Sequence, residues 1–405
     1  MTPSATVDDH AGLIERLVAP VIQALGAEPV AVLDALGRVS AADVHSDVDL
    51  PLFRNSQMDG FAVRAADVVS TPIALEVTGD IPAGHATPVT LIAGTALRIM
   101  TGAPMPTGAD AVVPVEDTEL VLGRDDALDG AIVTISRSRK AGEYVRERGS
   151  DLRRGDLLLA AGTRLAPRHL AALAAAGIAD VDVRRRLRVG VITTGAELVA
   201  HDEELAAGRI FDANRVALTT GIAEAGAVVS VAESSDDDPD TFRRILDAVV
   251  GASDLVITSG GVSKGAFEVV REVLEPLGAS VGSIAMQPGG PQGTAVVDGV
   301  PVVCFPGNPV STQVSFAVFL APLLRRISGL PAECTGTRTL VSPIVSVHGK
   351  RQFLRGITGV DGTVALASGP SSHLVAAMAR ADVLIDIPLE TTHLEVGETV
   401  TVWYL

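Results

Sequence analysis

The chain has 405 residues, 47% of them hydrophobic and 20% charged, so its composition excludes a disordered protein and allows two or more cores. Its 32 basic residues against 49 acidic residues give a formal net charge of −17, which disfavours nucleic-acid binding because no basic tract offsets it. With two cysteines, no signal-like N-terminus and no apolar stretch long enough to span a bilayer, we expect a soluble cytoplasmic protein.

The first part of the chain changes from a helical to a β-like pattern. Apolar periodicity predicts a helix that ends at Gly26, and a short helix follows at residues 32–36. Short apolar runs separated by Gly, Pro and Asp then predict a β-rich domain, with runs at 75–78, 96–100, 111–115 and 131–135. Residues 145–183 return to a helical pattern that we expect to complete the first segment in space.

The second half alternates strands with helices. Strands are expected at 189–192, 228–231, 255–257 and 302–303, and helices at 216–225, 239–250, 267–277 and 311–327. This alternation predicts a parallel sheet with helices on both faces. From residue 335 to the end, the β-like pattern resumes and predicts a small C-terminal β-domain.

Three loops rich in glycine and proline stand where strands are expected to lead into helices. They are residues 258–265, 287–293 and 305–311. At the carboxyl ends of parallel strands, glycine permits close backbone approach and free N–H groups bind phosphate-like anions. The three loops therefore predict an oxyanion site, although turns in any α/β domain also need glycine.

Acidic residues near these loops are candidates for holding Mg²⁺, which would supply positive potential in an acidic protein. Glu197 follows a strand end, where it lies either at the rim of the site or in the first turn of a helix. Asp238 before a proline predicts a helix N-cap, which leaves Asp237 free. Glu268 follows the first glycine loop and is either a metal ligand or a surface residue.

Two further residues have equally open interpretations. Asp59 stands in an Asp-Gly pair that is either a functional acid or an ordinary turn. Lys264 could bring a mobile charge over a phosphate, or it could be exposed to solvent. The sequence lacks the GxxxxGKS/T, HExxH, GxSxG and GxGxxG patterns, which disfavours a P-loop ATPase, a zinc hydrolase, a serine esterase and a Rossmann dehydrogenase.

Taken together, the motifs resemble the molybdopterin molybdenumtransferases, the MoeA-type family that includes the E domain of gephyrin. The matching segments appear in family order over nearly the whole chain. They are PLFRNSQMDGFAVR at 51–64, RIMTGAP at 98–104, GADAVV at 108–113, VR at 145–146 with GSD at 149–151, TGAEL at 194–198, DANR at 212–215, SGGVS at 259–263 and PGNPVS at 306–311.

The resemblance implies a multidomain α/β protein and a homodimer. The expected parts are a helical linking domain I (1–52 plus 142–186), a β-rich domain II (53–141), a central parallel α/β, MogA-like molybdopterin-binding domain III (187–330) and a C-terminal β-domain IV (331–405). The implied activity is insertion of molybdate into adenylylated molybdopterin with Mg²⁺, which releases AMP and molybdenum cofactor. The cleft is expected between domain III of one subunit and domain II of the other.

The resemblance also assigns roles to residues. The family's catalytic acids match Asp59, Asp151, Glu197, Asp237 and Glu268, of which the last three are expected to hold the metal, and Glu268 stands where aspartate is usual. Candidates for binding the pterin substrate and molybdate are Thr194, Gly195, Asn214, Ser259, Gly260, Gly261, Ser263, Lys264, Gly265, Gln287, Pro288, Gly289, Pro306, Gly307, Asn308, Pro309, Ser311, Arg351 and Arg355. Expected protein partners are the molybdopterin adenylyltransferase and molybdoenzyme chaperones.

One departure concerns charge. The family commonly has lysines around the second loop, where this chain has Ser283, Gln287 and Gly290. We hypothesise that Lys264, with Arg351 and Arg355, restores part of that charge. Two other functions stay open, a molybdopterin adenylyltransferase and a catalytically weakened paralogue or scaffold that binds pterin or a partner protein.

Overall fold

The computed structural model describes residues 5–84, 88–123, 128, 130–263, 268–331 and 335–405. The chain folds into two compact units, which are described separately here. Unit 1 combines Met1–Glu28 with Val183–Leu405, and unit 2 is Pro29–Asp182. None of the described helices combines the length and the apolar character needed to cross a bilayer.

Unit 1 contains a six-stranded sheet whose first four strands are parallel. The order is β16 (Val228–Ser235), β13 (Arg188–Thr194), β17 (Leu255–Ser259), β21 (Val300–Phe305), β20 (Pro291–Val297) and β18 (Ser280–Ser283). The predicted parallel sheet is confirmed for β16, β13, β17 and β21, whereas β20 runs antiparallel to β21. Every residue of β17 is buried, as expected for a strand covered on both faces.

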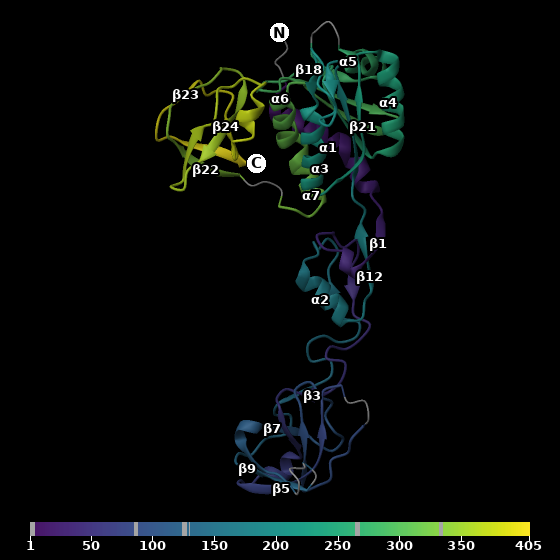
Figure 1. The fold of residues 1–405 in the computed structure, drawn as a ribbon, viewed down its shortest axis with the longest axis vertical. Helices are drawn as coiled ribbons and strands as arrows, with labels where there is room; N and C mark the ends of the chain where they lie inside the picture. The colour runs from purple at the N-terminus through teal and green to yellow at the C-terminus, as the bar shows by residue number, and fades with distance from the viewer. Residues whose placement is uncertain (1–4, 85–87, 124–127, 129, 264–267, 332–334) are drawn as a thin grey trace. The chain divides into compact units, whose positions relative to one another are not determined.

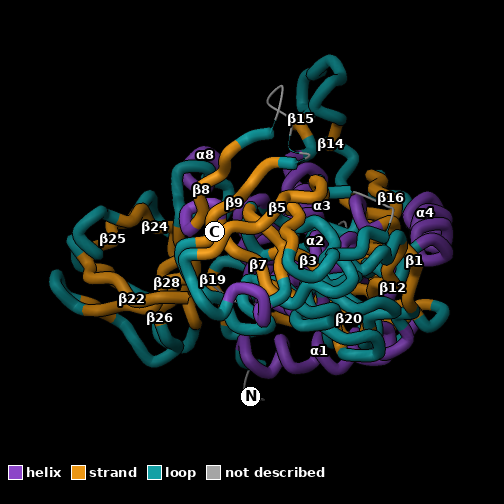
Figure 2. Tube along the Cα trace, turned by 90° about the horizontal axis from the view of Figure 1, so that it is seen from below, coloured by secondary structure: helices purple, strands orange, loops and turns teal. Residues whose placement is uncertain are grey.

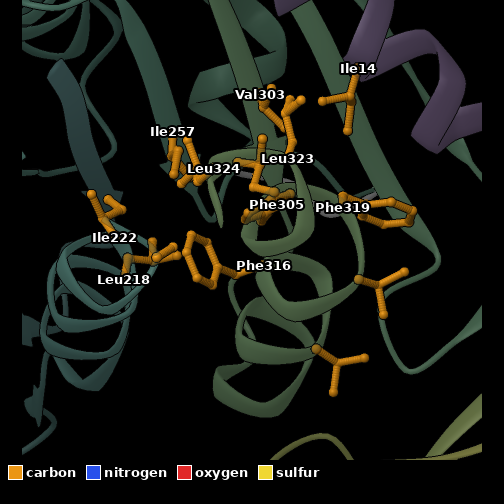
Figure 3. Packing of buried hydrophobic residues seen from close by; sticks show 14 of the residues in the cluster. Ile14, Leu218, Ile222, Ile257, Val303, Phe305, Phe316, Phe319, Leu323 and Leu324 are labelled. Atoms are coloured by element: carbon orange, nitrogen blue, oxygen red, sulfur yellow. The ribbon is translucent and has the colours of Figure 1, made fainter. Parts of the chain in front are cut away.

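Helices cover both faces of this sheet (Figure 1). They are α1 (Val7–Ala24), α3 (Ala213–Glu224), α4 (Pro239–Ala252), α5 (Val269–Leu274), α6 (Pro309–Ser315) and α7 (Ala321–Ile327). Alternate residues of β17 divide between two cores, because side chains alternate along a strand. Ile257 packs in one core with residues of α1, α3 and α7, as Figure 3 shows, and Val256 packs in the other with residues of α4 and α5.

The helix boundaries refine the predictions. Asp238 caps α4 by accepting a hydrogen bond from the Thr241 amide at 2.8 Å, which confirms its predicted role. The predicted helix at 311–327 consists of α6, a π-helical turn at Phe316–Leu320 and α7. The helix predicted at 267–277 is shorter, because α5 is followed by a 3-10 turn at Glu275–Leu277.

The C-terminal part of unit 1 is a small barrel, which confirms the predicted β-domain. Its strands are β19 (Met286–Gln287), β24 (Arg351–Thr358), β25 (Thr363–Leu366), β22 (Thr335–Leu340), β28 (Thr399–Tyr404) and β26 (Val383–Ile387). A further pairing of β24 with β26 closes the ring. Figure 2 shows β22, β24, β25, β26 and β28 gathered in one body. Leu354, Ile385 and Val402 belong to its separate apolar core.

Unit 2 is built around a second six-stranded sheet. Its order is β7 (Ala111–Pro114), β4 (Gly60–Val63), β6 (Thr95–Ile99), β5 (Ile73–Ile81), β9 (Ala131–Ile135) and β8 (Thr118–Val121). The predicted strands at 75–78, 96–100, 111–115 and 131–135 are therefore confirmed. Val77 and Val133 lie in one of its apolar cores, and Ile99 and Val112 lie in the other.

The helical pattern predicted for residues 145–183 is mostly wrong. Only α2 (Pro167–Ala175) is an α-helix, while β10 (Val145–Arg146), β11 (Leu157–Leu159) and β12 (Asp180–Arg184) pair with β3 (Asn55–Ser56), β2 (Val44–His45) and β1 (Ala27–Ala31). Glycines 149, 155, 162 and 177 adopt positive φ, which interrupts helices. Helix α1 belongs to unit 1, and the division into four domains stays a prediction.

Candidate active site

The carboxyl ends of β13, β17 and β21 bring two of the three glycine loops together. Thr193 pairs in register with Ser259, and Ser259 pairs in register with Phe305, so the loops that follow these strands leave the same end of the sheet. This carboxyl end of the parallel strands is called the edge of the sheet below. The Gly260 amide donates to the Phe305 carbonyl at 3.0 Å. A Cβ atom added to Gly307 would lie 3.1 Å from the Cα atom of Gly260, so the two backbones are in contact.

Gly260 occupies a conformation and a space that only glycine fits. Its φ is +104°, and an added Cβ would lie 2.5 Å from Oγ1 of Thr194 and 2.8 Å from the carbonyl oxygen of Thr194. Any side chain would force the loop away from β13. Glycine at this position therefore allows the backbone of the loop to approach β13 closely.

A buried polar network fixes both loops. The Asn214 amide nitrogen donates to Oγ of Ser259 at 3.0 Å and to the Gly307 carbonyl at 2.7 Å. Oγ of Ser259 lies 3.1 Å from Oγ1 of Thr312, which donates to the Pro306 carbonyl at 2.7 Å. The side-chain oxygen of Asn214 is buried and has no hydrogen-bond partner among the described residues, so the network offers one free acceptor.

Asp212 places Asn214 in this network. It is buried and caps α3 by accepting from the Arg215 amide at 2.9 Å. Hydroxyl groups of Thr193 and Ser234 donate to its carboxylate at 2.5 and 3.0 Å. Sequence reasoning missed Thr193, Ser234 and Thr312 as supports of the site, because nothing in a sequence distinguishes these hydroxyls from those of other helices and strands.

The second glycine loop differs from its prediction, because it joins β19 to β20 and does not lead into a helix. Gln292, which belongs to the predicted loop but is not among the predicted site residues, holds it against α6. Its amide nitrogen donates to the Gly289 carbonyl at 2.8 Å and to Oγ of Ser315 at 2.7 Å. Gln287 accepts a hydrogen bond from Gln352 of β24, so its side chain contacts the barrel.

The acids of unit 1 stand around this edge without forming a metal cluster. Glu197 is exposed between β13 and β14 (Leu198–Val199), so its alternative placement in a helix is wrong. Asp237 is half-buried between β16 and the cap of α4. Glu268 accepts a hydrogen bond from the Ser263 amide at 2.6 Å.

These positions decide what the acids can do with a metal. Within the described ranges, no group of three or more His, Cys, Asp or Glu side chains could hold a metal ion. Glu197, Asp237 and Glu268 therefore do not fit a site made by protein ligands alone. Lys264 and Gly265 lie outside the described residues.

The two arginines of β24 have different surroundings. Arg351 forms an ion pair with Asp386 at 2.6 Å and with Asp8 at 2.9 Å, which raises its pKa. Its guanidinium is bound by two carboxylates, and its predicted role as an anion ligand stays a prediction. Arg355 is fully buried and donates to Oγ of Ser368 and to the carbonyls of Gly369 and Ser371.

Arg355 supports the site through this loop. Burial lowers the pKa of its guanidinium. The Ser372 carbonyl of the same loop accepts a hydrogen bond from the Val310 amide at 3.0 Å, at the start of α6. Ser311, the next residue, is buried in α6. Arg355 thus holds a loop of the barrel beside the candidate molybdate contact.

Asp59 and Asp151 belong to unit 2, and both are exposed. Oδ1 of Asp59 accepts from the Thr101 amide at 2.6 Å and from the Thr101 hydroxyl at 2.7 Å, and these bonds hold its pKa below its usual value. The Asp151 amide donates to the Leu50 carbonyl at 2.9 Å. A cleft that these acids share with the residues of unit 1 stays a prediction.

Among the residues that the structure describes, no cysteine nucleophile is available at this edge. Cys304, in β21, is fully buried, and burial raises the pKa of its thiol to about 12. The thiol therefore stays neutral, and a neutral thiol is a poor nucleophile. What the edge offers is backbone N–H groups, fixed amides and hydroxyls, and carboxylates at the rim, a set suited to binding and orienting an anionic ligand.

Comparison with known proteins covers nearly all of the chain. Three family models match, described as the MoeA N-terminal region (domain I and II) at residues 5–177, a probable molybdopterin binding domain at 190–326 and the MoeA C-terminal region (domain IV) at 337–405. Molybdopterin molybdenumtransferase 2 of Mycobacterium tuberculosis (strain ATCC 25618 / H37Rv) is 41% identical over 414 residues, which cover 99% of both chains.

Other relatives agree. Molybdopterin molybdenumtransferase of Nostoc sp. (strain PCC 7120) is 35% identical over 420 residues, or 100% of this chain and 94% of the relative. The crystal structure of a molybdopterin biosynthesis MoeA protein from Pyrococcus horikoshii superimposes with a TM-score of 0.80 and 33% identity, over 96% of this chain and 98% of that one.

Proposed function

The chain belongs to the MoeA family of molybdopterin molybdenumtransferases, and we propose that it inserts molybdate into adenylylated molybdopterin with Mg²⁺, releasing AMP and molybdenum cofactor. Molybdenum insertion in cofactor biosynthesis is the activity of the family as a whole. The adenylylated form of the substrate, the magnesium requirement, the homodimer and the cytoplasmic location are the parts that this proposal adds.

The observation that supports the proposal is the backbone cradle formed by the Gly260 and Gly307 loops. The backbone N–H groups of Gly261 and Gly307 donate no hydrogen bond to another described residue. Such groups stabilise phosphate oxygens without a formal charge, and the Asn214 network keeps them in place before the substrate arrives. The pyrophosphate link of the substrate would lie across these loops.

The pterin end of the substrate has N–H groups that need acceptors. The free side-chain oxygen of Asn214 is one such acceptor within the same network. Molybdate would bind near Ser311, beside the loop that Arg355 holds. These residues bind and orient, and since the reaction needs no protein nucleophile, positioning and electrostatics would supply most of the rate.

Magnesium fits this site only together with the substrate. Mg²⁺ commonly binds one or two carboxylates and completes its coordination with water and phosphate oxygens. Glu197 and Asp237 have the donor chemistry for this, and Glu268 already accepts the Ser263 amide. When bound, the ion would neutralise charge on the phosphates.

Two alternatives have specific observations attached. A molybdopterin adenylyltransferase is disfavoured, because the matches at 5–177 and 337–405 are to MoeA regions. A catalytically weakened paralogue or scaffold is favoured by the uncharged side chains of Ser283 and Gln287 and by Gly290 at the second loop. Both alternatives bind a pterin without molybdate-dependent release of AMP.

The test supplies the purified protein with adenylylated molybdopterin, Mg²⁺ and low micromolar molybdate, and measures AMP release and cofactor formation in parallel. Molybdate-dependent release of AMP supports the transferase. Tight binding of the substrate without turnover would identify the scaffold, and ATP consumption with molybdopterin would identify the adenylyltransferase. Removal of Mg²⁺ by a chelator should abolish turnover while the fold, followed by circular dichroism, stays unchanged.

A complementation experiment tests the proposed shared cleft. Asp59→Asn and Glu197→Gln change acids in different units of the chain, and each variant alone should be inactive. If the acids of one site come from two subunits, a mixed dimer keeps one intact site, and random mixing restores about a quarter of wild-type activity. No recovery after verified subunit exchange would show that both acids act within one chain.

A further inference from the structure

A cavity of about 490 Å³ lies in unit 1, apart from the glycine loops of the proposed active site. Its walls come from α3, from the helical stretch 313–325, from α8 (Val375–Met378) and from the end of β28. Apolar side chains make up most of the lining, among them Leu218, Phe316, Met378 and Trp403. This volume and lining are typical of a pocket for a small organic molecule.

The aromatic walls are fixed before any ligand binds. The indole N–H of Trp403 donates to Asp386 at 3.1 Å, and its ring meets the edge of Phe353 at a centroid distance of 5.9 Å. Phe316 packs so closely on α3 that a Cβ atom added to Gly221 would lie 2.8 Å from its ring. Figure 3 shows Phe316 pointing toward Leu218 of α3. A ligand would therefore meet preformed ring surfaces.

One acid and one base line the cavity. Glu224, on α3, is exposed, and none of the ion pairs among the described residues includes it. Arg325, the basic residue of the lining, donates from Nε to the Pro331 carbonyl at 3.0 Å. The net charge of −17 adds a field that attracts cations and repels anions. Aromatic faces also bind cations favourably.

We propose that this cavity binds a small organic cation with an aromatic body. The aromatic part would lie among Leu218, Phe316 and Trp403, and the cationic group would face Glu224 at the rim. This inference does not rest on the proposed function, since the cavity shares no residue with the glycine loops.

Trp403 provides a direct measurement, because it is the only tryptophan of the chain. Three nitroaromatic quenchers of equal size and different charge serve as probes, namely 4-nitrobenzylamine, 4-nitrobenzyl alcohol and 4-nitrobenzoate. Each is titrated into the full-length protein while tryptophan fluorescence is recorded. The proposal predicts saturable quenching, tightest with the amine and weakest with the benzoate. Linear, unsaturable quenching or equal affinity for all three probes would overturn it.

Variants locate the binding. Glu224→Gln should weaken amine binding by about fivefold, the upper range for an exposed charge pair, and leave alcohol binding unchanged. Glu272→Gln, an exposed glutamate of α5, is the matched control and should change neither. Ala217→Phe should fill the cavity and abolish binding of both probes. If this variant does not fold, Ala381→Leu, which fills the cavity from the wall that includes α8, should have the same effect. Unchanged quenching in a folded, filled variant would show that the probes bind elsewhere.

Discussion

Candidate functional groups are held differently in the two units. In unit 1 they lie at the edge of the parallel sheet, and in unit 2 they lie in the Asp59 loop. At the edge, Asn214, Ser259 and Thr312 are buried and bond to one another and to the backbone of both glycine loops. In unit 2, Asp59 is exposed, and its carboxylate accepts two hydrogen bonds from Thr101.

Because of this difference, we expect substitutions in the two regions to affect stability and activity differently. Changing a buried, bonded group leaves its partners unsatisfied, so the fold and the site are lost together. Changing an exposed acid removes a charge that the substrate would meet while the fold stays intact. We therefore expect variants of the sheet edge to fail in both stability and activity, and variants of the Asp59 loop to fail in activity alone.

The largest effect is expected for Gly260→Ala. The new methyl group would meet Thr194 at 2.5 and 2.8 Å in a backbone conformation with φ of +104°. We expect the free energy of unfolding to fall by about 3–4 kcal/mol, because strain and overpacking each cost about 1–3 kcal/mol and act together here, and turnover to be lost. Urea unfolding followed by circular dichroism measures the first quantity.

Gly251→Ala is the matched control for this prediction. Gly251 lies near the end of α4, and an added Cβ would meet nothing within 4 Å. Alanine should be neutral there or stabilise the helix by up to about 1 kcal/mol. If both substitutions destabilise equally, close contact at the Gly260 loop is not the reason for its sensitivity.

Asn214→Ala and Asp59→Ala together test the difference between the sheet edge and the Asp59 loop. Loss of the Asn214 amide leaves Ser259 and the Gly307 carbonyl without a donor, which should cost about 2–3 kcal/mol of stability. Both variants should lower turnover by about 100-fold or more, the usual size of losing one oriented group. Only Asn214→Ala should lower the urea midpoint of unfolding. If Asp59→Ala lowered the midpoint equally, the two regions would not differ in their contribution to stability.

Much of this architecture is predictable from the sequence, because it follows from patterns that are local. The buried run at β17, the Asp238-Pro239 cap and the strands of unit 2 each have a short signal that the structure confirms. The region 145–183 failed for the opposite reason. Its apolar residues form short strands that pair with residues about 100 or more positions earlier, as Leu157 does with His45, and no local pattern encodes such a partner.

Some features of the candidate site can likewise be predicted from local sequence, and others cannot. The glycines at 260 and 307 are visible in the sequence, and their contact follows from strand order. The partners of Arg351 are not visible, since Asp8 and Asp386 are far from it in the chain and Arg351 looks like any other free cation. Thr312 and Gln292 have no sequence signal, because their roles depend on what the folded chain brings beside them.

His10, in α1, tests whether a buried polar residue away from the glycine loops also affects the stability of unit 1. It is buried in α1 with its ring 4.9 Å from that of Phe319, and burial lowers its pKa to about 4 although Gln292 opposes this shift. Between about pH 6.5 and 4 the unfolded chain binds a proton that the folded chain excludes. Stability is therefore complete above about pH 6.5 and falls as the pH decreases, by about 1–2 kcal/mol at pH 5.

His10→Phe keeps an aromatic ring against Phe319 and removes the titration. The free energy of unfolding of this variant should vary less between pH 7 and pH 5 than that of the parent protein. Urea titrations at the two pH values measure the difference. His45, exposed in unit 2, is the control, and His45→Phe should keep the parent's pH dependence. The same slope in both variants would assign the pH effect to other groups.

The smallest effect is expected at the opposite edge of the same sheet. Burial alone would raise the pKa of Asp254, but hydrogen bonds from Arg185 at 2.8 Å and Arg188 at 3.0 Å lower it to about 2. Because the folded pKa lies below the ordinary value of 3.8, this stabilisation is complete above about pH 4 and is lost as the pH falls toward 2.

Asp254→Asn should therefore cost about 1–2 kcal/mol at pH 7, reduced by solvent around the two arginines, and should leave turnover unchanged. Asp247→Asn, which removes one exposed pair with Arg243 on α4, is the control and should change neither quantity. Asp254 stands just before β17, and Asn214 of α3 bonds to the loops at the opposite ends of the strands. A loss of turnover in Asp254→Asn would therefore mean that activity follows the stability of the whole sheet. Normal turnover would confine the functional requirement to the edge where the glycine loops meet.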